Sequence, residues 1–312
     1  MRMTVDTRMR CFGGIGTYVR CLLPFLEQKC TVKQLNSTAP IYSIREQFDF
    51  FLKIPPCDLF WSPHFNSALL PIKAKKHVVT IHDLYHLDHL ETLSLVKQFY
   101  AKTVLRKVIS RVDQILTVSE FSKGRLLHYF PEAKEKLNVI YSGCDHLLSV
   151  EPTPVKNVPS KFYLFVGNNK PHKNEAFVRE CVDKMGRHLV SVGHGLAPVT
   201  EGELCWLYKH AQGLIFPSLY EGFGLPPLEA MALGCPVWAS DIEPVREICG
   251  NAAVYFDPTN PESLCDALME SDSLIEKGKQ RAAQFSWEES ARKHFQVFQQ
   301  QGEFSALSLS SQ

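Results

Sequence analysis

Two glutamates on either side of a glycine-rich turn form the segment of this sequence best suited to bind a polar ligand. Glu221 is followed by Gly222-Phe223-Gly224-Leu225 and two prolines, and Glu229 comes eight residues after Glu221. Pro226 and Pro227 suit the first turn of a helix, where a missing backbone N–H costs little. Glu229 would then lie in the first turns, where its carboxylate could accept hydrogen bonds from both hydroxyls of a ribose diol. We predict that Glu221 and exposed amides of the glycine turn bind hexose hydroxyls.

A basic turn follows the first strand of the second half of the chain. The segment from Gly167 to Asn174 contains Asn168, Lys170 and Lys173, and a helix is predicted to begin at its end. The unpaired N–H groups of a helix N-terminus attract anions, and lysines add positive charge at the same place. We therefore predict a diphosphate site here, although a solvated basic turn is the simpler interpretation of this segment taken alone.

A second glycine loop follows the first strand of the chain and opens the first long helix. Gly13, Gly14 and Gly16 would let backbone N–H groups approach an anion closely. A tight strand-to-helix turn is an equally good interpretation of the loop by itself. Because Val19 stands where a dinucleotide fingerprint requires glycine, the loop suits a phosphate but does not predict NAD binding.

His82 and Asp83 come directly after a predicted strand over 77–81. A histidine at the carboxyl end of a strand could donate to a sugar hydroxyl or respond to charge near neutral pH. A hydrogen-bonded turn histidine is the competing interpretation. His86, Asp88 and His89 lie nearby, but their spacing matches no metal motif, so we predict no metal site.

Composition excludes several classes of protein. The chain has 312 residues, a formal net charge of +1 and 45% hydrophobic residues. This length predicts two domains of roughly 150 residues each, and the balanced charge argues against a general nucleic-acid binder. No apolar run approaches the ~18–20 residues that span a bilayer, and Met1–Asp6 lacks the features of a secretion signal. We therefore predict a cytoplasmic protein. The ten scattered cysteines, with no C-x-x-C pair, suit small buried side chains in a reducing compartment.

One predicted helix suggests that the protein could also make peripheral contact with a membrane. The helix predicted over 93–110 is followed by Arg111 and combines basic and apolar side chains: Lys97, Lys102, Arg106 and Lys107 with Phe99, Tyr100, Val104, Leu105 and Val108. Basic amphipathic helices can lie on anionic membranes. An ordinary surface helix with its apolar face on a sheet is the interpretation we favour.

Helices alternate with short apolar strands along both halves of the chain, which indicates parallel βαβ units. A proline-containing stretch over 150–160 separates the halves and is predicted to be a linker. Predicted strands cover 3–7, 59–62, 77–81, 114–118 and 138–141, then 162–166, 189–192, 213–216, 236–239 and 253–256. Predicted helices cover 17–28, 93–110 and 120–129, then 174–185, 202–210, 227–233, 261–269 and 287–300.

In chain order these motifs resemble those of the retaining glycosyltransferases of family 4. The resemblance covers nearly the whole chain: the loop at 13–16, His82, the segment 117–122, the Lys173 turn, the Glu221/Glu229 pair, and the segments 239–241 and 250–253. It implies an α/β fold of GT-B type, with two Rossmann-like domains facing each other across a cleft. The implied domains are an N-terminal acceptor domain over 1–150, a C-terminal donor domain over 151–290, and a helix over 291–312 that returns to the N-terminal domain before a frayed tail.

The resemblance also implies roles for individual residues. Gly13, Gly14 and Gly16 would lie over the donor diphosphate, and Lys173, with Asn168 and Lys170 beside it, would bind that group. Glu229 would hold the ribose, and Glu221 with Gly222, Phe223, Gly224 and Leu225 would hold the transferred sugar. His82 would lie near sugar and acceptor, and Ser119 would line the cleft. The implied catalytic residues are His82, Lys173 and Glu221. No metal or cofactor is implied, because the nucleotide-diphosphate sugar is a co-substrate.

Two departures from the family pattern bear on activity. The family commonly has an arginine where Asn168 stands, so Lys173, with Lys170 or His172, must meet the diphosphate charge. The chain is also short over 193–198 and compact over 28–55, where family members often build the nucleobase and acceptor sites. These losses raise the alternative of a catalytically weakened scaffold or a nucleotide-sugar binding protein.

The predicted reaction is a metal-independent transfer of a hexose, mannosyl or related, to a glycan or lipid-linked acceptor. Because retaining members of this fold resemble one another in lacking a placed carboxylate nucleophile, we predict front-face attack on the side that the diphosphate leaves. A hydrolase using both glutamates as acid and base is disfavoured, since it needs neither the glycine loop nor the basic turn. An epimerase of the same fold is not expected to carry the Glu221/Glu229 spacing.

Overall fold

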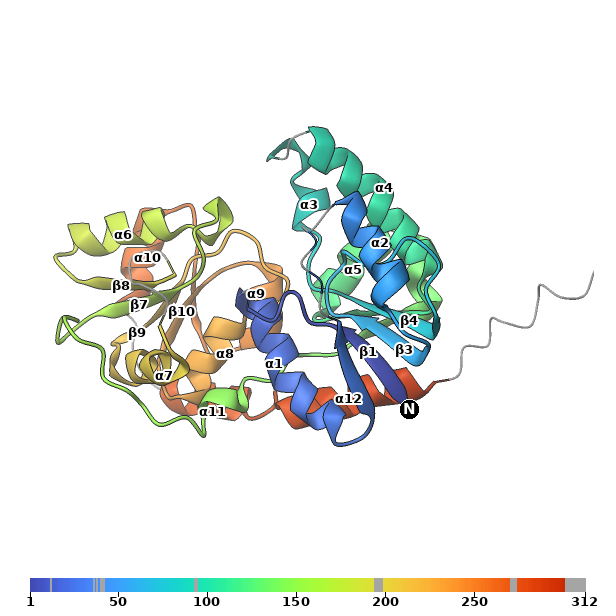
Figure 1. Cartoon of the computed structure of the whole chain (residues 1–312). Helices are drawn as coiled ribbons and strands as arrows, with labels where there is room; N and C mark the ends of the chain where they lie inside the picture. Colours follow the sequence, from blue (N-terminus) through green and yellow to red (C-terminus); the bar gives the residue numbers. More distant parts are fainter. Residues whose placement is uncertain are drawn as a thin grey trace, which may run out of the picture. The chain divides into compact units, whose positions relative to one another are not determined.

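The computed structural model describes residues 1–11, 13–35, 37, 39, 43–92, 95–193, 199–269 and 274–300, with the side chains of 92–97 and 99–101 also outside the description. Its contacts divide the chain into two units (Figure 1). Unit 1 comprises Met1–Ile140 and the chain from Glu288 onward, and unit 2 comprises Tyr141–Trp287. The predicted linker over 150–160 therefore belongs to unit 2. The shortened segment 194–198 and the tail after 300 lie outside the described residues.

Unit 1 is built on a six-stranded sheet with the order β2-β1-β3-β4-β5-β6. Every neighbouring pair of strands is parallel, as the alternation of helices and strands predicted. The strands are β1 (Arg2–Asp6), β2 (Thr31–Leu35), β3 (Cys57–Ser62), β4 (Ala74–Ile81), β5 (Gln114–Thr117) and β6 (Leu137–Val139). Their carboxyl ends form the edge that presents ligand-binding residues in open parallel sheets.

Helices cover both faces of this sheet: α1 and α12 on one, and α2, α4 and α5 on the other (Figure 1). Tyr18 of α1 packs edge-on against Trp61 of β3 and places its hydroxyl 2.5 Å from His294 of α12. On the other face, Phe50 of α2 packs against Phe60. The helices are α1 (Gly13–Glu27), α2 (Ile44–Lys53), α3 (Tyr85–Asp88), α4 (Leu95–Arg111), α5 (Glu120–Tyr129) and α12 (Trp287–Gln299).

The sequence did not reveal β2 and α2, and it placed the start of α1 four residues late. In β2 only Leu35 is buried, because this edge strand exposes most of its side chains, and it therefore lacks a clear apolar pattern. In α2 the Ser43 side chain accepts from Glu46 N and caps the helix, but several apolar residues point outward. The apolar residues of α2 are therefore not confined to the face that packs on the sheet, and their pattern did not predict a helix packed there.

Unit 1 is expected to lose stability as the pH falls from 6.5 to 4. Burial lowers the pKa of His77 and of His294 from 6.5 to about 4, so both are neutral in the folded protein. Below pH 6.5 the unfolded chain binds protons that the folded chain does not, which corresponds to roughly 3 kcal/mol for each histidine. Hydrogen exchange of unit 1 peptides against pH measures this loss. His294→Leu should be less stable at pH 7 but lose less on acidification, and an equal loss in both proteins would contradict the assignment.

Unit 2 is built on a five-stranded parallel sheet with the order β11-β10-β9-β7-β8. Helices α6 and α10 cover one face, and α7 and α8 cover the other (Figure 1). The strands are β7 (Tyr163–Val166), β8 (Leu189–Val192), β9 (Gly213–Phe216), β10 (Val237–Ser240) and β11 (Val254–Phe256). The helices are α6 (Glu175–Lys184), α7 (Glu201–His210), α8 (Leu225–Ala232), α9 (Glu243–Cys249), α10 (Pro261–Ala267) and α11 (Leu274–Ala282).

The two remaining helices of unit 2, α9 and α11, were not predicted. Only seven residues long, α9 begins with Glu243-Pro244, so it offers two turns and little periodicity. The sequence of α11 is mostly polar, and its small residue Gly278 lies against Met231 of α8. Both helices depend on the neighbours they pack against more than on their own pattern.

Helix α4 is an ordinary surface helix, as we favoured. Its apolar residues Leu105, Val108 and Ile109 are buried against strands β4 and β5. Its basic side chains Lys102, Arg106, Lys107 and Arg111 are exposed. In the parts of the chain that the structure describes, no helix is both long and apolar enough to cross a membrane.

Candidate donor-sugar site

The site begins with an ion pair at the carboxyl edge of the unit 2 sheet. Lys173 ends a short 3-10 turn (Pro171–Lys173) after β7, and Glu221 lies in the loop after β9. Lys173 Nζ donates to Glu221 Oε1 at 2.5 Å, and the side chains are 18% and 12% exposed. Both predicted catalytic groups of this unit therefore meet, although 48 residues separate them. The pair is open enough for a ligand to reach and dry enough for its charges to interact strongly.

Backbone and amide contacts hold the lysine turn against the glutamate loop. Leu219 N donates to His172 O at 2.8 Å, which joins the two segments directly. Asn174 adopts a left-handed conformation with φ of 59°, and its side-chain amide donates to Pro217 O at 3.3 Å and Pro258 O at 2.8 Å. Three loops that follow β7, β9 and β11 are thus fixed to one another around Lys173.

The glycine turn after Glu221 opens helix α8 as predicted. Gly224 is the N-cap residue with φ of 118°, a conformation that favours glycine, and the prolines occupy the first helical turn. Gly222, Phe223 and Gly224 are buried, however, whereas the sequence predicted exposed amides at this turn. Phe223 explains the difference, because its ring packs near Tyr141 and Phe285 and draws the turn inward.

Glu229 lies in α8 and is 6% exposed. The Tyr208 hydroxyl of α7 donates to its Oε2 at 2.9 Å, and His146 Nε2 lies 3.4 Å from its Oε1. Burial and the nearby Glu229 charge raise the pKa of Tyr208 well above 10, so the phenol stays protonated and donates. A carboxylate has about four acceptor positions, so a ribose diol can still bind beside these two partners.

The other predicted residues of this turn are exposed. Asn168 and Lys170 both lie at the surface, in the segment between β7 and the 3-10 turn. The Lys170 backbone N–H donates to Asn168 O at 2.9 Å, which closes a tight bend. Either side chain is free to reach an anion from the solvent side, whereas Lys173 is held in place by Glu221.

One residue of this site was missed from the sequence. Ser218 follows β9 and is 1% exposed, and its hydroxyl has no hydrogen-bond partner within the described chain. A buried hydroxyl without a partner costs about 1–3 kcal/mol, so a bound ligand or water would relieve it. The available signal was its position between a buried strand and Glu221, which lies three residues later.

In unit 1 the glycine loop forms the first turn of α1 rather than a separate loop. Gly13 and Gly14 are exposed, with their N–H groups among the first of the helix, so they can meet an anion. Gly16 is buried because the chain turns back on itself: a Cβ there would lie 2.6 Å from Arg10 O. The glycines at 13 and 14 thus suit ligand contact, and Gly16 has a packing role.

His82 lies between β4 and α3 and is partly buried. Its Nε2 lies 2.8 Å from Pro63 O, so Nε2–H donates and Nδ1 is left as an acceptor. Burial lowers its pKa, which corrects the expectation of a charge response near pH 7. The Tyr18 ring packs edge-on at 4.8 Å and fixes the imidazole. His82 is therefore neutral and offers Nδ1 as a hydrogen-bond acceptor, while its Nε2–H is used by Pro63 O.

Ser119 has a structural role. It is fully buried, and its hydroxyl accepts from Ser122 N at 3.0 Å to cap helix α5. A serine immediately before a helix is a common N-cap, and the motif Ser119-Glu120-Phe121-Ser122 fits this purpose. The segment therefore joins the end of β5 to the first turn of α5, and the predicted place of Ser119 in the donor site stays a prediction.

Comparison with known proteins assigns these features to one kind of enzyme. Residues 35–146 match the family described as Glycosyltransferase Family 4, and residues 196–293 match Glycosyl transferases group 1. The O-antigen chain mannosyltransferase RfbU of Salmonella typhimurium is 28% identical over 264 residues, covering 75% of this chain and 70% of RfbU. The O-antigen chain mannosyltransferase B of Escherichia coli is 26% identical over 268 residues, covering 72% of this chain and 70% of the relative.

A solved structure gives the fold. Sucrose-phosphate synthase from Thermosynechococcus elongatus superposes with a TM-score of 0.77 at 18% identity, covering 96% of this chain and 98% of that chain. The chain is a glycosyltransferase of the GT-B fold. The resemblance to family 4 that the motifs predicted is confirmed by the two family matches.

The glycosyltransferase also contains a buried charged cluster that sequence reasoning missed. Arg8 donates to Asp6 at 2.6 Å and pairs with Glu46, and Asn66 donates to Glu46 at 2.5 Å. His64 Nε2 lies 3.1 Å from Asp6. All lie at or just beyond the carboxyl ends of β1 and β3, or on α2, and are nearly inaccessible to water. The signal was an acid at the end of the first strand, Asp6, and a base two residues later, Arg8.

Burial alone would raise the pKa of Asp6, but hydrogen bonds from Arg8 and His64 hold it well below its ordinary value. Asp6 is therefore charged, and the members of the cluster provide one another's hydrogen-bond partners. Arg8 belongs to the segment that connects β1 to Gly13, so the cluster fixes the path of the chain into the exposed glycines. Its role is to position that turn.

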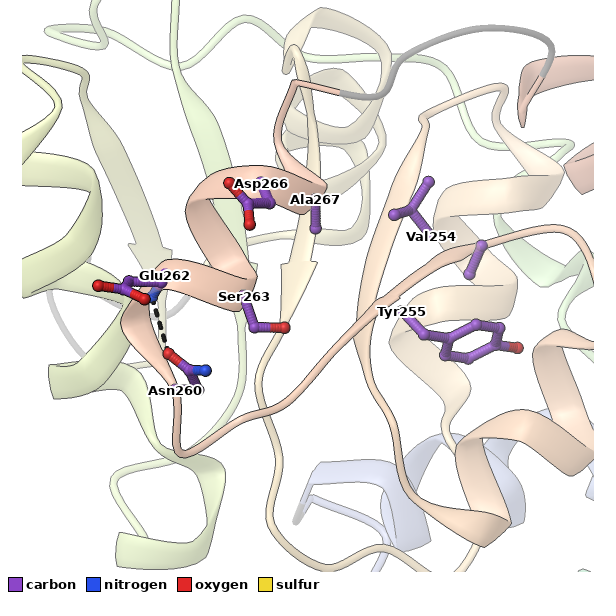
Figure 2. A pocket seen from close by; sticks show the side chains of 8 residues that line it. Val254, Tyr255, Asn260, Glu262, Ser263, Asp266 and Ala267 are labelled. Carbon is purple, nitrogen blue, oxygen red and sulfur yellow. Dashed lines mark hydrogen bonds between the residues drawn. The ribbon is translucent and has the colours of Figure 1, made fainter.

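A separate recess of about 520 Å³ opens beside β11 and α10 (Figure 2). Asn260 Oδ1 accepts from Glu262 N there, which caps α10. Its lining contains the carboxylates of Glu262 and Asp266 but no lysine or arginine, so it does not suit a diphosphate. None of the predicted donor residues of the glycosyltransferase lines it. Within the described chain no cluster of His, Cys, Asp and Glu forms a metal site, and all ten cysteines are free.

Proposed function

We propose that the protein is a retaining, metal-independent hexosyltransferase that uses a nucleoside-diphosphate sugar and needs no further cofactor. The Lys173–Glu221 ion pair is the observation that carries this proposal. It brings one cation for a leaving diphosphate and one carboxylate for sugar hydroxyls to the same edge of the unit 2 sheet. Glu229, in the next helix, supplies an acceptor for the ribose. The transferred sugar is mannose or a related hexose, because both O-antigen relatives are named mannosyltransferases.

The proposed chemistry is front-face transfer. The bond between the anomeric carbon and the diphosphate oxygen breaks while the acceptor hydroxyl attacks from the same side, and a phosphate oxygen takes the hydroxyl proton. Negative charge grows on the leaving phosphate, and its stabilisation is the main task of the protein. Lys173 and the N–H groups of the turn before α6 provide a cation and dipoles for this purpose without a metal. His82 Nδ1 is the proposed acceptor for a sugar or acceptor hydroxyl.

We expect one of UDP, GDP and ADP to bind at micromolar concentration in the presence of EDTA, and Glu229→Ala to abolish that binding. Two hydrogen bonds from a ribose diol to a carboxylate are worth about 1.5–3 kcal/mol each, so the affinity should fall at least about 100-fold. Titration calorimetry with the purified chain measures this. NAD is the matched negative ligand.

The outcome separates the enzyme from its alternatives. A bound nucleotide whose mannosyl derivative yields an α-linked product, seen by NMR, supports retaining transfer. Binding without transfer to a glycan acceptor favours the nucleotide-sugar binding protein. Binding of none of UDP, GDP and ADP would overturn the active-transferase proposal in favour of a scaffold, and Asn168 and the shortened second unit would then be the first features to examine.

We further propose a lipid-linked glycan acceptor, reached through peripheral contact at the cytoplasmic membrane face. Helix α2, rather than α4, provides the surface: Ile44, Phe48 and Leu52 recur every fourth residue and are 79%, 55% and 70% exposed. Arg45 borders this strip and is exposed, while Lys53 on the same helix pairs with Asp49. An apolar helix face with basic neighbours suits an anionic lipid surface.

We expect the double variant Phe48→Ser/Leu52→Ser to lose binding to phosphatidylcholine–phosphatidylglycerol vesicles by about 10-fold or more, since each deletes exposed apolar surface that the lipid would cover. Co-sedimentation of the whole chain measures it. The matched control is Met269→Ser/Ile275→Ser, which removes apolar side chains that are 75% and 47% exposed in unit 2. Equal binding by all three proteins, or none by the wild type, would reject the proposal. A wild-type dimer that the α2 variant abolishes would instead make α2 a self-association surface.

A further inference from the structure

Both carboxylate oxygens of Glu229 are held by side chains that do not belong to the predicted site. Tyr208 contacts Oε2 from α7, and His146 contacts Oε1 from a short 3-10 turn (Asp145–Leu147). Tyr208 is fully buried and the His146 side chain is 13% exposed. Neither contact requires a ligand, so the carboxylate is oriented before the nucleotide arrives.

The proton positions in this chain of contacts are defined. The indole N–H of Trp287 is a donor only, and it lies 3.2 Å from His146 Nδ1. His146 Nδ1 must then be the unprotonated acceptor, which puts the imidazole proton on Nε2, the atom that faces Glu229. Trp287 thereby sets the tautomer with which His146 meets the carboxylate.

The same residues lie where the chain passes between the two units. The chain enters unit 2 at Tyr141 and leaves it after Trp287, and these two crossover segments pair with each other. Cys144 N donates to Phe285 O at 3.2 Å, and Trp287 N donates to Asp145 Oδ1 at 2.9 Å.

The fit between the two crossover segments requires a glycine. A Cβ on Gly143 would lie 2.2 Å from Trp287 N, so no other residue could occupy this position without shifting the backbone. The aromatic contacts of Phe223 with Tyr141 and Phe285 add a second link, from the glycine turn to both segments. Donor residues and crossover segments therefore form one packed assembly in unit 2.

We infer that His146, Tyr208 and Trp287 are positioning residues for Glu229, and that they set how strongly the protein recognises the ribose diol. The inference rests on the proposed nucleoside-diphosphate donor. Two acceptor positions of Glu229 are occupied by Tyr208 and His146, and the remaining two match the two hydroxyl donors of one diol. Without His146 only Tyr208 of these two partners still holds the carboxylate, which can then rotate about that contact and present those positions in more directions. Recognition of the ribose then depends on residues that never touch it.

The test compares a ribonucleoside diphosphate with its 2′,3′-dideoxy analogue by titration calorimetry on the full chain. We expect His146→Ala to weaken binding of the ribonucleotide about 10-fold, the value of one hydrogen bond to a charged group, while binding of the dideoxy analogue stays unchanged. His146→Gln should restore most of the loss, because its amide can accept from Trp287 and donate to Glu229. Trp287→Phe keeps a ring but removes the N–H. Its affinity for the ribonucleotide should lie between those of His146→Ala and His146→Gln.

The control is His210→Ala, which removes an exposed histidine that stacks on Trp206 of the same unit; it should change neither affinity. Equal losses for both nucleotides in His146→Ala would show general damage and overturn the inference, as would no loss for either. If Glu229→Ala abolishes ribose discrimination and His146→Ala does not, the proposed donor site stands and the positioning role falls. If the wild type binds no nucleoside diphosphate, the proposed function itself has failed.

Discussion

Lys173→Ala is expected to lower the rate of hexosyl transfer by about 10²–10³-fold, the usual effect of removing one preorganised donor that stabilises transition-state charge. Lys173 is 18% exposed and held by Glu221, so its ammonium group needs little reorganisation when the phosphate departs. The loss should appear mainly in kcat, because the charge on the leaving diphosphate grows during the reaction. Steady-state transfer assays with the donor that calorimetry identifies measure it.

Lys170→Ala is the matched control for this prediction. It removes the same charge from the same turn, but at an exposed side chain with no ion pair in the described structure. Water screens such a charge, so we expect a change of less than about 3-fold, well under the value of one hydrogen bond to a charged group. If Lys170→Ala and Lys173→Ala lose equal activity, the total charge of the turn matters and the placement of Lys173 does not.

Glu221→Gln refines the interpretation of the ion pair. The carboxylate both competes with phosphate for Lys173 and, in our proposal, binds the hexose. Removing its charge should therefore strengthen binding of the nucleoside diphosphate and weaken transfer of the sugar. Opposite changes in these two quantities, seen in one variant, would be hard to obtain from a purely structural glutamate.

The fold could be predicted where strands are buried on both faces. The bounds expected for β8 and β9 agree with the structure. The continuous apolar run Gly213–Phe216 marks β9 as a central parallel strand, whereas β8 lies at the edge of its sheet but still buries Val190, Ser191 and Val192. Edge strand β2 and the short helix α9 could not be predicted in this way. Their stability comes from neighbours such as β1 and α8, which no local pattern records.

The site could be predicted where one segment carries several motif residues. The glycine turn, the prolines of α8 and the position of Glu229 follow from a single stretch of sequence. His146, Tyr208 and Trp287 could not be found, because each lies in a different part of the chain and none belongs to a motif. The pairing of Lys173 with Glu221 was also invisible, since it depends on β7 and β9 being neighbours in the sheet.

Arg8→Met is expected to destabilise unit 1 by about 3–5 kcal/mol, the usual cost of breaking a buried ion pair by removing one partner. Asp6 and Glu46 are 0% and 1% exposed, and Arg8 contacts both. Without the guanidinium the protein must bury two carboxylates with fewer partners or protonate them. Pulsed hydrogen exchange during urea unfolding, read on peptides from β1 and β3, measures the change, with unit 2 peptides as the internal reference.

Arg10→Met provides the matched control, because Arg10 lies in the same segment but is exposed, and within the described residues its side chain makes one long hydrogen bond, of 3.5 Å, to Gln34. It should change stability by less than about 0.5 kcal/mol. The triple variant Arg8→Met/Asp6→Asn/Glu46→Gln should recover part of the loss, since it removes the unpaired charges along with the arginine. If it is instead as unstable as Arg8→Met, the loss comes from missing packing around the arginine stem and not from buried charge. That result would also remove the electrostatic reason for giving this cluster a part in the path of the chain from β1 to Gly13.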